Sequence, residues 1–355
     1  GGITAESDLE FEYEDLAKNS LAGTEEEHCT ELLLDHKEPG NVKIEYSKDN
    51  YGALKKAADA VLEAVTGKKY FYYQSEVILT FSAEDEVSGV DHFVWTYNQE
   101  KNVSENANKI NALDSYSKQS VKAVQSVKTD GTKTTTFTAT VTLPPEVVDP
   151  DEQDQLRGYF EVSAIDKCGN GEKENTENNY LNDENNVVVV DNISPEMKVS
   201  YKFKGTSEEY QDVVSEDGKE HHHYTSKNIE MTLDVTEANF YQDGVVVELS
   251  RDAGATYEKI SNAVTWTDGA NDLHTGTYTI KASENNDVDY RIRVTYADRS
   301  GNEMKVVDTK ENCSEKSAGE YISSVMTIDT IAPEISFDSN PETDFTTDGK
   351  KKCVK

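Results

Sequence analysis

Short stretches of alternating apolar and polar residues recur along the whole chain, and this alternation predicts β-strands with one buried face. The stretches are rich in β-branched and aromatic residues, and turn-forming Gly, Asn, Asp and Pro separate them. Many short strands without alternating helices indicate an all-β fold of antiparallel β-sandwiches. The predicted strands are residues 77–81, 93–97, 135–143, 159–165, 187–190, 198–203, 229–235, 245–249, 277–281 and 290–296.

One stretch follows a helical period instead. Tyr51, Leu54 and Leu62 lie on one stripe of residues 50–66, which begin at a capping Asn and are followed by a helix-ending Gly. The corresponding gap between strands in the second half of the chain, residues 206–226, is polar. We therefore predict one inserted helix near 50–66 that is not part of a shared core.

Three segments share a pattern in which an apolar run ends at Asp, three residues follow, and Pro begins a new strand. Asp191 lies 156 residues after the first of these aspartates and 138 residues before the last. These intervals suit whole domains and are too long for solenoid units. We call these segments the junction segments: LLLDHKEPGNVKIEYS with Asp35 and Pro39, VVVVDNISPEMKVSYKF with Asp191 and Pro195, and MTIDTIAPEISFDSN with Asp329 and Pro333.

A second pattern precedes each junction segment: an alternating strand ends at Asp, and Asn follows four residues later. Side chains of Asp and Asn in such a turn can bond nearby backbone, and glycine at positions 169 and 301 permits a positive φ. We call these the turn segments: FEYEDLAKN with Asp15 and Asn19, VSAIDKCGN with Asp166 and Asn170, and VTYADRSGN with Asp298 and Asn302.

A third match aligns SEVILTFSAED, which ends at Asp85, with KNIEMTLDVTE, which ends at Glu237, as the second strand of each unit. Together the matches predict two complete domains, residues 35–190 and 191–328. The last strands of an earlier repeat then occupy residues 1–34, and a further repeat starts at residues 329–355. The chain is expected to be part of a longer array.

The turn and junction segments AIDKCGN with VVVVDNISP, and YADRSGN with MTIDTIAP, resemble the bacterial immunoglobulin-like repeats of Gram-positive secreted and cell-surface proteins. Those repeats commonly end in an A-x-D-x-x-G-N-like turn, a last apolar strand and a V-D-x-x-x-P junction. The resemblance implies tandem immunoglobulin-like sandwiches in a secreted or surface protein that acts as a stalk, spacer or adhesive module. It carries little function by itself, because sandwich modules host many unrelated activities.

The net charge of the chain disfavours some classes of binding partner. The 35 Lys and Arg residues face 69 Asp and Glu residues, and the resulting net charge of −34 disfavours nucleic acid and membrane-surface binding. No apolar run approaches the roughly 18 to 20 residues that cross a bilayer, so we expect no membrane insertion within this chain. The four cysteines, Cys29, Cys168, Cys313 and Cys353, fall in four different predicted units and are interpreted as isolated thiols.

Calcium at the junctions is an alternative that the aspartates leave open. The ion needs six to eight oxygens, and Asp191, Asn192 and Asp329, with Asp166 or Asp298 as additions, supply only part of such a set. The favoured interpretation is that each junction Asp caps a turn and that Pro fixes the start of the edge strand. We therefore assign no metal, cofactor or catalytic residue.

Other residues that could carry out chemistry are assigned structural roles instead. The histidines 221–223 are expected in an exposed loop, and Lys43 and Lys198 are expected on the solvent face of their strands, away from any isopeptide bond in the core. The aromatic residues 70–73, with Trp95 and Tyr97, are expected in a core rather than on a sugar-binding platform, whereas Trp266 is ambiguous. No motif of a hydrolase nucleophile, zinc protease or nucleotide site occurs.

These observations favour a non-catalytic stalk or adhesion module of a bacterial secreted or cell-surface protein. Its partners would be the neighbouring domains of the same polypeptide and a host protein or glycan. The alternative is an accessory carbohydrate- or protein-binding region of a large secreted hydrolase, and an enzyme built from scattered residues is a third hypothesis.

Overall fold

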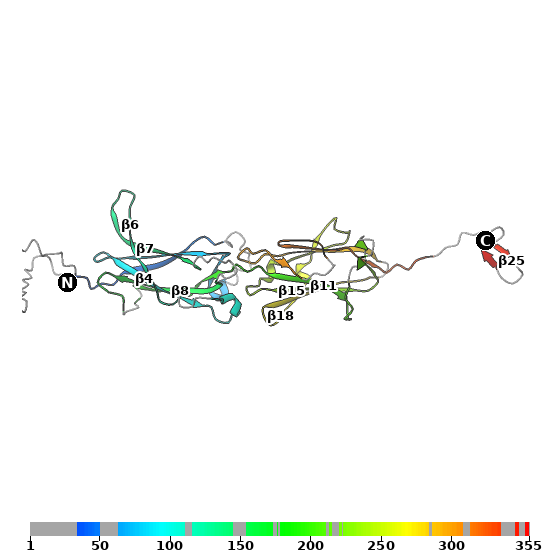
Figure 1. Ribbon diagram of the computed structural model, residues 1–355, viewed down its shortest axis with the longest axis horizontal. Helices are drawn as coiled ribbons and strands as arrows, with labels where there is room; N and C mark the ends of the chain where they lie inside the picture. The colour runs from blue at the N-terminus through cyan, green and yellow to red at the C-terminus, as the bar shows by residue number, and fades with distance from the viewer. Residues whose placement is uncertain are drawn as a thin grey trace, which may run out of the picture.

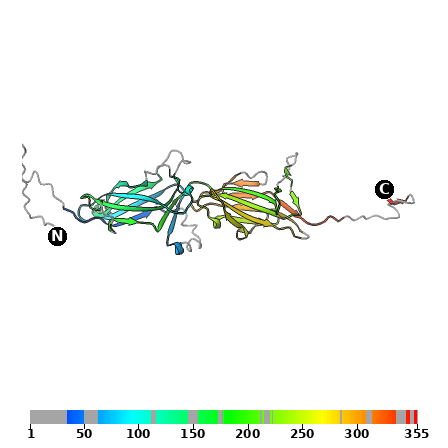
Figure 2. The same cartoon turned by 90° about the horizontal axis from the view of Figure 1, so that it is seen from below.

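Strands and connecting segments make up nearly all of the described part of the computed structural model, which is all-β there apart from short helical turns. Figure 1 and Figure 2 show two β-rich bodies that lie end to end along one axis. The structure describes residues 34–49, 63–110, 116–144, 154–172, 176, 178–210, 213–214, 220–221, 223–283, 286–307, 313–334, 345–347 and 352–354.

The first body, which we call the first sandwich, contains two sheets. One sheet has the antiparallel order β1 (Gly40–Tyr46), β3 (Val77–Glu84), β7 (Lys133–Leu143) and β6 (Val124–Val127). The other has the order β2 (Lys69–Tyr73), β10 (Asn186–Val190), β8 (Leu156–Asp166), β4 (Val90–Gln99) and β5 (Gln119–Lys122), with β9 (Tyr180–Asn182) also on β8. Only the pair β2 and β10 is parallel in this sheet. The 3-10 helix η1 (Glu105–Asn108) follows β4.

The second body, the second sandwich, has sheets of corresponding order. One sheet runs β18 (Thr265–Asp268), β19 (Leu273–Ile280), β15 (Ile229–Thr236), β11 (Glu196–Phe203) and β21 (Lys305–Val306). The other runs β14 (His223–Thr225), β24 (Met326–Asp329), β20 (Asp287–Thr295), β16 (Val246–Ser250) and β17 (Glu258–Lys259), with β23 (Glu320–Ser323) on β20 and β22 (Cys313–Ser317) on β23. Two pairs of the second sandwich are parallel, β14 with β24, as β2 with β10 in the first sandwich, and β11 with β21.

Four smaller strands and two helical turns complete the described residues. The strands β12 (Val213–Val214) and β13 (Glu220–His221) pair with each other, as do β25 (Phe345–Thr347) and β26 (Lys352–Val354). The 3-10 helices η4 (Gln242–Gly244) and η5 (Ser261–Ala263) flank β16 and β17.

Each sandwich buries its own apolar cluster between its two sheets. The buried face of β3 includes Phe81, which packs with Phe93 of β4 and Phe160 of β8, all with no measurable exposure. In the second sandwich, Leu233 of β15 and Ile292 of β20 are buried in the same way. The apolar core of the first sandwich contains only residues before Asp191, and that of the second sandwich contains only residues after it. Alternating burial along these strands is the physical basis of the predicted pattern.

The all-β prediction is confirmed, and each predicted strand overlaps an observed one. For the predicted helix near 50–66, residues 63–66 are helical, and residues 50–62 lie outside the described residues. Residues 1–33, with the first turn segment, also lie outside them. The polar stretch 206–226 contains the short strands β12, β13 and β14, so of the histidines expected in a loop, His221 lies in β13 and His223 in β14.

The expected side-chain directions are also confirmed. Trp95 is 4% exposed and belongs to the first core together with Tyr73 and Tyr97, so these rings form no platform for sugars. Trp266 is partly buried against the second core. Lys43 is exposed, on the face of β1 opposite to the side chains that pack on the core.

Two arginines cross the seam between the sandwiches in opposite directions. Arg157, on β8, donates from its guanidinium to Asn239 Oδ1 at 2.9 Å. Arg299, in the third turn segment, donates to the Tyr72 hydroxyl at 2.9 Å, and its guanidinium carbon lies 3.9 Å from the ring centroid of Tyr241. A guanidinium over an aromatic face is a favourable cation–π contact, and partial burial strengthens it. The seam is therefore held from both sides.

Close packing of β8 against β4 gives a stability prediction. A Cβ added at Gly158 would collide with the backbone oxygen of Asn98 and lie 2.8 Å from the Tyr97 ring, whereas a Cβ at Gly40 would meet nothing within 4 Å. We expect Gly158→Ala to lower the free energy of unfolding of the first sandwich by about 1–3 kcal/mol, the usual effect of overpacking. Urea denaturation measures this, with Gly40→Ala as the control. Equal stabilities of the two variants would contradict the packing argument.

Candidate functional site

The two described turn segments, at Asp166 and Asp298, each hold the junction segment at the start of their own sandwich. Asp166 Oδ1 accepts the backbone N–H groups of Cys168 and Asn170, both at 2.8 Å. The Asn170 side chain donates to Asp166 Oδ2 at 2.6 Å and to the carbonyl oxygen of Asp35 at 3.0 Å. Gly169 has a φ of 85°, the left-handed conformation that the turn requires and that favours glycine. The turn thus binds chain 135 residues away in sequence.

The second sandwich repeats this arrangement. Asp298 Oδ1 accepts the backbone N–H groups of Gly301 and Asn302 at 2.8 and 2.9 Å. The Asn302 side chain donates to Asp298 Oδ2 and to the carbonyl oxygen of Asp191, both at 2.8 Å. We call this bonding pattern of turn Asp, Asn and junction carbonyl the latch.

Each junction Asp also caps its own turn. Asp35 Oδ1 accepts the N–H of Lys37 at 3.0 Å, Asp191 Oδ1 that of Ile193 at 3.0 Å, and Asp329 Oδ1 that of Ile331 at 2.8 Å. A bond from the residue two positions later is the usual Asx turn. The favoured interpretation of the junction aspartates as turn caps is therefore confirmed.

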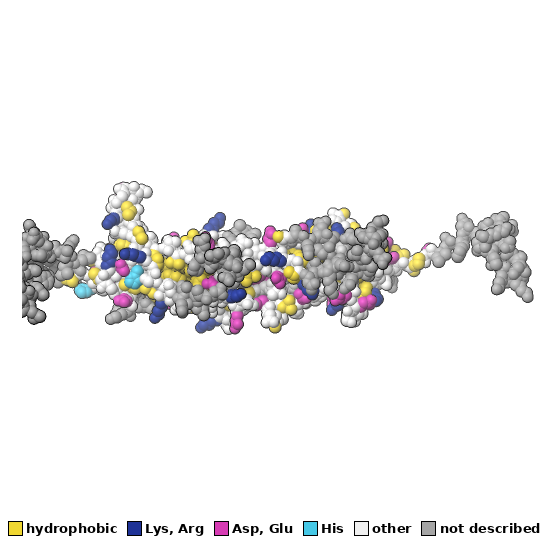
Figure 3. Space-filling model, viewed as in Figure 1, with side chains coloured by type: hydrophobic (Ala, Val, Ile, Leu, Met, Phe, Trp, Pro, Cys, Tyr) yellow, Lys and Arg dark blue, Asp and Glu magenta, His cyan; other side chains and the backbone are white. Residues whose placement is uncertain are grey.

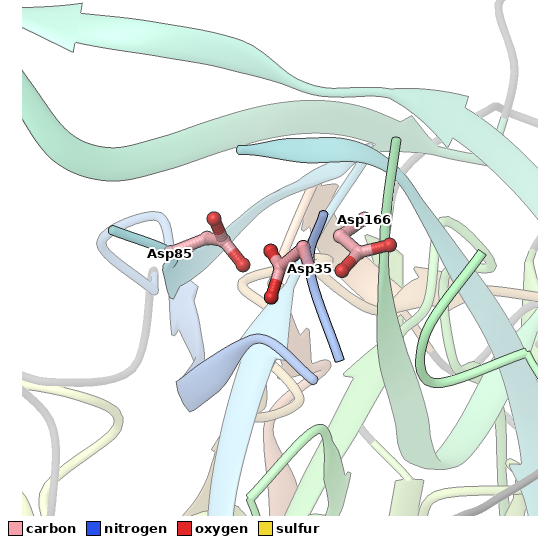
Figure 4. Close-up of side chains that lie close together, drawn as sticks. All are labelled: Asp35, Asp85 and Asp166. Carbon is pink, nitrogen blue, oxygen red and sulfur yellow. The ribbon is translucent and has the colours of Figure 1, made fainter. Parts of the chain in front are cut away.

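The latch brings the carboxylate of the junction Asp close to that of the turn Asp, and a third carboxylate joins them. In the first sandwich the third group is Asp85, directly after β3, and Figure 4 shows Asp35, Asp85 and Asp166 pointing toward one another. One carboxylate oxygen from each lies within 4.8 Å of the others. Asp35 and Asp85 are 8% and 9% exposed and Asp166 is 2% exposed, so this first cluster lies almost out of the solvent.

The second cluster has the same construction but contains Glu237, directly after β15, in place of an Asp. Oxygens of Asp191, Glu237 and Asp298 again lie within 4.8 Å of one another, and the three residues are only 2%, 4% and 3% exposed. Three ionised carboxylates buried this closely repel strongly, so the site needs protons, hydrogen-bond donors or a cation.

Backbone donors satisfy much of the first cluster. Asp85 Oδ1 accepts the N–H groups of Val87 at 3.0 Å and Gly89 at 2.6 Å, and Asp35 Oδ2 accepts that of Ser88 at 3.1 Å. Burial raises the pKa of Asp35, but the hydrogen bonds from Lys37 and Ser88 outweigh burial and leave that pKa below its usual value. Asp35 is therefore ionised at neutral pH.

The second cluster is less well satisfied. Glu237 Oε1 accepts the N–H of Asn239 at 2.7 Å, but Glu237 Oε2 is buried and has no hydrogen-bond partner among the described residues. Burial, followed by the charge of Asp191, raises the pKa of Glu237 to about 9. The same two causes raise the pKa of Asp298 to about 7, and burial raises that of Asp191. The buried, unpartnered oxygen therefore belongs to a residue of the three-carboxylate cluster.

The donor set fits a hard cation. All three side chains of the second cluster offer oxygen, the ligand that calcium prefers, and none offers the imidazole or thiolate preferred by softer metals. Asp191, Glu237 and Asp298 would hold the ion, and the orphaned Glu237 Oε2 is the observation that favours occupancy of this cluster. A bound divalent ion would stabilise the three ionised carboxylates together.

The second cluster also borders the seam. Asn239 donates to Asp191 Oδ2 at 2.7 Å while accepting from Arg157 of the first sandwich at 2.9 Å. Arg157 in turn donates to Glu100 at 2.8 Å. A single asparagine therefore links the carboxylate cluster to the neighbouring sandwich.

Sequence reasoning identified some of these residues and missed others. Of the suggested calcium oxygens, Asp191 and Asp298 do come together, but Asp166 belongs to the first cluster. Asn192 points elsewhere and exchanges hydrogen bonds with Gln155. Sequence reasoning did not place Asp85 and Glu237 in a site. The signal was the third sequence match, whose two aligned strands end at these two acids.

Comparisons with known proteins add no family assignment. No protein-family model matches the chain, and no curated protein matches it. Among the described residues, no helix has the length and apolar character needed to span a membrane.

The raised pKa values predict how stability depends on pH without metal. A carboxyl group whose folded pKa lies above its unfolded pKa favours folding while protonated, and this contribution is lost as pH rises toward the folded pKa. In EDTA we expect the free energy of unfolding of the second sandwich to fall between about pH 5 and pH 9, by at most about 1.4 kcal/mol per pH unit for each group. Glu237→Gln should flatten this fall.

Scanning calorimetry at a series of pH values measures the effect. Glu258→Gln, which removes an exposed acid of the same sandwich, is the matched control and should keep the slope of the original protein. A second sandwich whose stability rises across this pH window would contradict the account of the cluster.

Proposed function

We propose that this chain is a non-catalytic stalk segment of tandem immunoglobulin-like domains, in which calcium at the second cluster stiffens the seam. The observation that carries the proposal is the buried triad of Asp191, Glu237 and Asp298 with its unpartnered Glu237 Oε2, placed one residue from the seam.

Strand order supports the immunoglobulin-like assignment. In such folds, strands A, B, E and D form one sheet and G, F and C form the other. The order β1, β3, β7, β6 corresponds to A, B, E, D, and β10, β8, β4, β5 correspond to G, F, C and C′. The order β11, β15, β19, β18 with β24, β20, β16, β17 follows the same assignment. Recurrence of both the topology and the latch supports a tandem repeat.

The arrangement of the two sandwiches suits a spacer better than an enzyme. The polar groups of the two clusters hold segments of backbone together, and the large aromatic side chains suggested for sugar binding, such as Trp95, are buried. Bodies placed end to end extend the chain along one axis (Figure 2). A stalk of this kind fits a secreted or surface-anchored protein, where millimolar calcium suits weak extracellular sites.

Calcium binding has a direct test. Addition of calcium to the EDTA-treated protein should raise the melting temperature of the second sandwich, because a ligand that binds only the folded state stabilises it. At a concentration about ten times Kd the gain is about 1.4 kcal/mol. Glu237→Gln should abolish the gain, and Glu258→Gln should retain it. An unchanged melting temperature of the original protein at 10 mM calcium would remove calcium from the proposal.

Stiffness of the seam is tested separately by small-angle X-ray scattering. We expect Arg157→Ala combined with Arg299→Ala to broaden the distance distribution and shorten the mean extension, because both crossing contacts are lost. Arg251→Ala, which removes an exposed arginine at the β16–β17 turn, is the control. If the double variant scatters like the original protein, the arginines do not hold the seam.

A further inference from the structure

One segment of the first sandwich has a net positive charge, opposite in sign to that of the whole chain. Residues 118–133, which we call the basic edge, contain Lys118, Lys122, Lys128 and Lys133 and a single acid, Asp130. Their net charge is therefore +3 within a chain of net charge −34. All four lysines are exposed.

The basic edge is also where both sheets of the first sandwich end. The strand β5 is the last strand of one sheet and β6 is the last strand of the other, and only Ala123 separates them. In the part of the chain that the structure describes, β5 pairs only with β4 and β6 only with β7. Backbone donors and acceptors on the outer side of such edge strands are free to pair with another chain.

The hairpin of β6 and β7 presents this edge in a preformed shape. It projects from the body of the sandwich, as Figure 1 shows, and Figure 3 shows hydrophobic and basic side chains on the projection. Val124 and Val127 are 66% and 58% exposed. The Gln125 side chain donates to the carbonyl oxygen of Thr134 at 2.7 Å, so side-chain bonds within the hairpin support its shape.

The N–H of Val127 points away from β7. Val127 and Lys133 face each other, and the N–H of Lys128 donates to the carbonyl oxygen of Thr132 at 2.9 Å. Hydrogen-bonded and non-hydrogen-bonded pairs alternate along an antiparallel ladder. Because Lys128 bonds to Thr132, the neighbouring pair of Val127 and Lys133 is a non-hydrogen-bonded pair. The N–H and C=O of Val127 are therefore directed toward the open edge.

No lysine of the basic edge forms an ion pair with a carboxylate of the described residues, despite the excess of acids in the chain. Ion pairs elsewhere in the described part of the chain include those of Lys68, Lys202 and Lys227. A positive patch that its own protein does not neutralise attracts anionic partners.

The corresponding edge of the second sandwich differs. Residues 258–268, which include β17 and β18, contain Glu258 and Asp268 against one lysine. Trp266 of β18 packs against the second core and lies 5.1 Å from the Phe240 ring centroid, so it does not present an open apolar surface. The basic edge is therefore specific to the first sandwich.

We propose that the basic edge is a docking site for an extended acidic polypeptide segment, which adds to β6 as a further strand. Open backbone groups specify a polypeptide, the exposed valines accept alternate apolar side chains, and the unpaired lysines select acidic neighbours. This combination favours a peptide strand over a polysaccharide or polyphosphate, which would use the lysines but not the strand edge.

The test uses a fluorescein-labelled peptide of alternating Glu and Val, followed by fluorescence anisotropy in 150 mM salt. At this ionic strength the Debye length is about 8 Å, so most of the remaining negative charge is screened. We expect Lys122→Glu with Lys128→Glu to weaken binding at least tenfold. The control, Lys43→Glu with Lys48→Glu, makes the same charge change on exposed lysines elsewhere in the first sandwich and should bind like the original protein.

Strand addition is tested apart from charge. Val127→Pro removes the outward N–H, at an edge position that tolerates proline, and should also weaken binding at least tenfold. A peptide with N-methyl groups on alternate residues should fail to bind the unaltered protein, which keeps the test valid if the proline variant misfolds.

Three results would overturn the proposal. No binding by the original protein would mean that the lysines only protect the edge from aggregation. Equal binding by the N-methylated peptide would exclude strand addition. Heparin binding that the two lysine substitutions abolish, without peptide binding, would make the site a general polyanion site.

Discussion

The hydrogen bonds of the latch determine where each sandwich begins. One amide group, that of Asn170 or Asn302, satisfies both a buried turn carboxylate and the carbonyl oxygen of a distant junction residue. A buried polar group left without its partner costs about 1–3 kcal/mol, and loss of this amide would leave two such groups. The latch therefore stabilises the closed end of each sandwich and positions the junction Asp.

The same constraint creates the electrostatic problem of the site. Closing the latch forces the carboxylates of the junction Asp and the turn Asp together, and the end of the second strand supplies a third. In the first cluster this third group is Asp85, and backbone N–H groups meet its carboxylate closely. Glu237 is one methylene longer, and its second oxygen is buried without a hydrogen-bond donor among the described residues. One change of side-chain length thus separates a hydrogen-bonded cluster from one suited to a cation.

Much of the fold could be predicted from the sequence, because alternation is a local signal. The strands 77–81 and 229–235 were evident from their period, and Lys43 was placed correctly by the same argument. The turn caps at Asp35, Asp191 and Asp329 were predictable for the same reason, since the Asx turn spans two residues.

The clusters were harder to predict, because they depend on contacts between residues far apart in the chain. Glu237 meets Asp191 and Asp298 only after the latch closes, and 69 acidic residues make any single carboxylate uninformative. The aligned ends of the two matched strands did contain the missing acids. What the alignment could not supply was their direction, since only the fold shows that both point toward a junction. Nor could it show the seam, because Arg157 lies outside the matched segments and the turn segment that contains Arg299 does not reveal its partner, the Tyr72 hydroxyl.

Positive charge is scarce in this chain, so its placement determines which contacts form. Arg157 pairs with Glu100 of its own sandwich, and both Arg157 and Arg299 also bind neutral groups across the seam, Asn239 and the Tyr72 hydroxyl. A guanidinium can be held this way because its planar face also stacks on aromatic rings, here that of Tyr241. The surrounding negative charge reduces the cost of burying these cations, and the seam in turn places Arg157 close enough to Asp191 to favour its ionised form. Excess acid and half-buried arginine therefore stabilise each other, and the junction between the sandwiches is where the two meet.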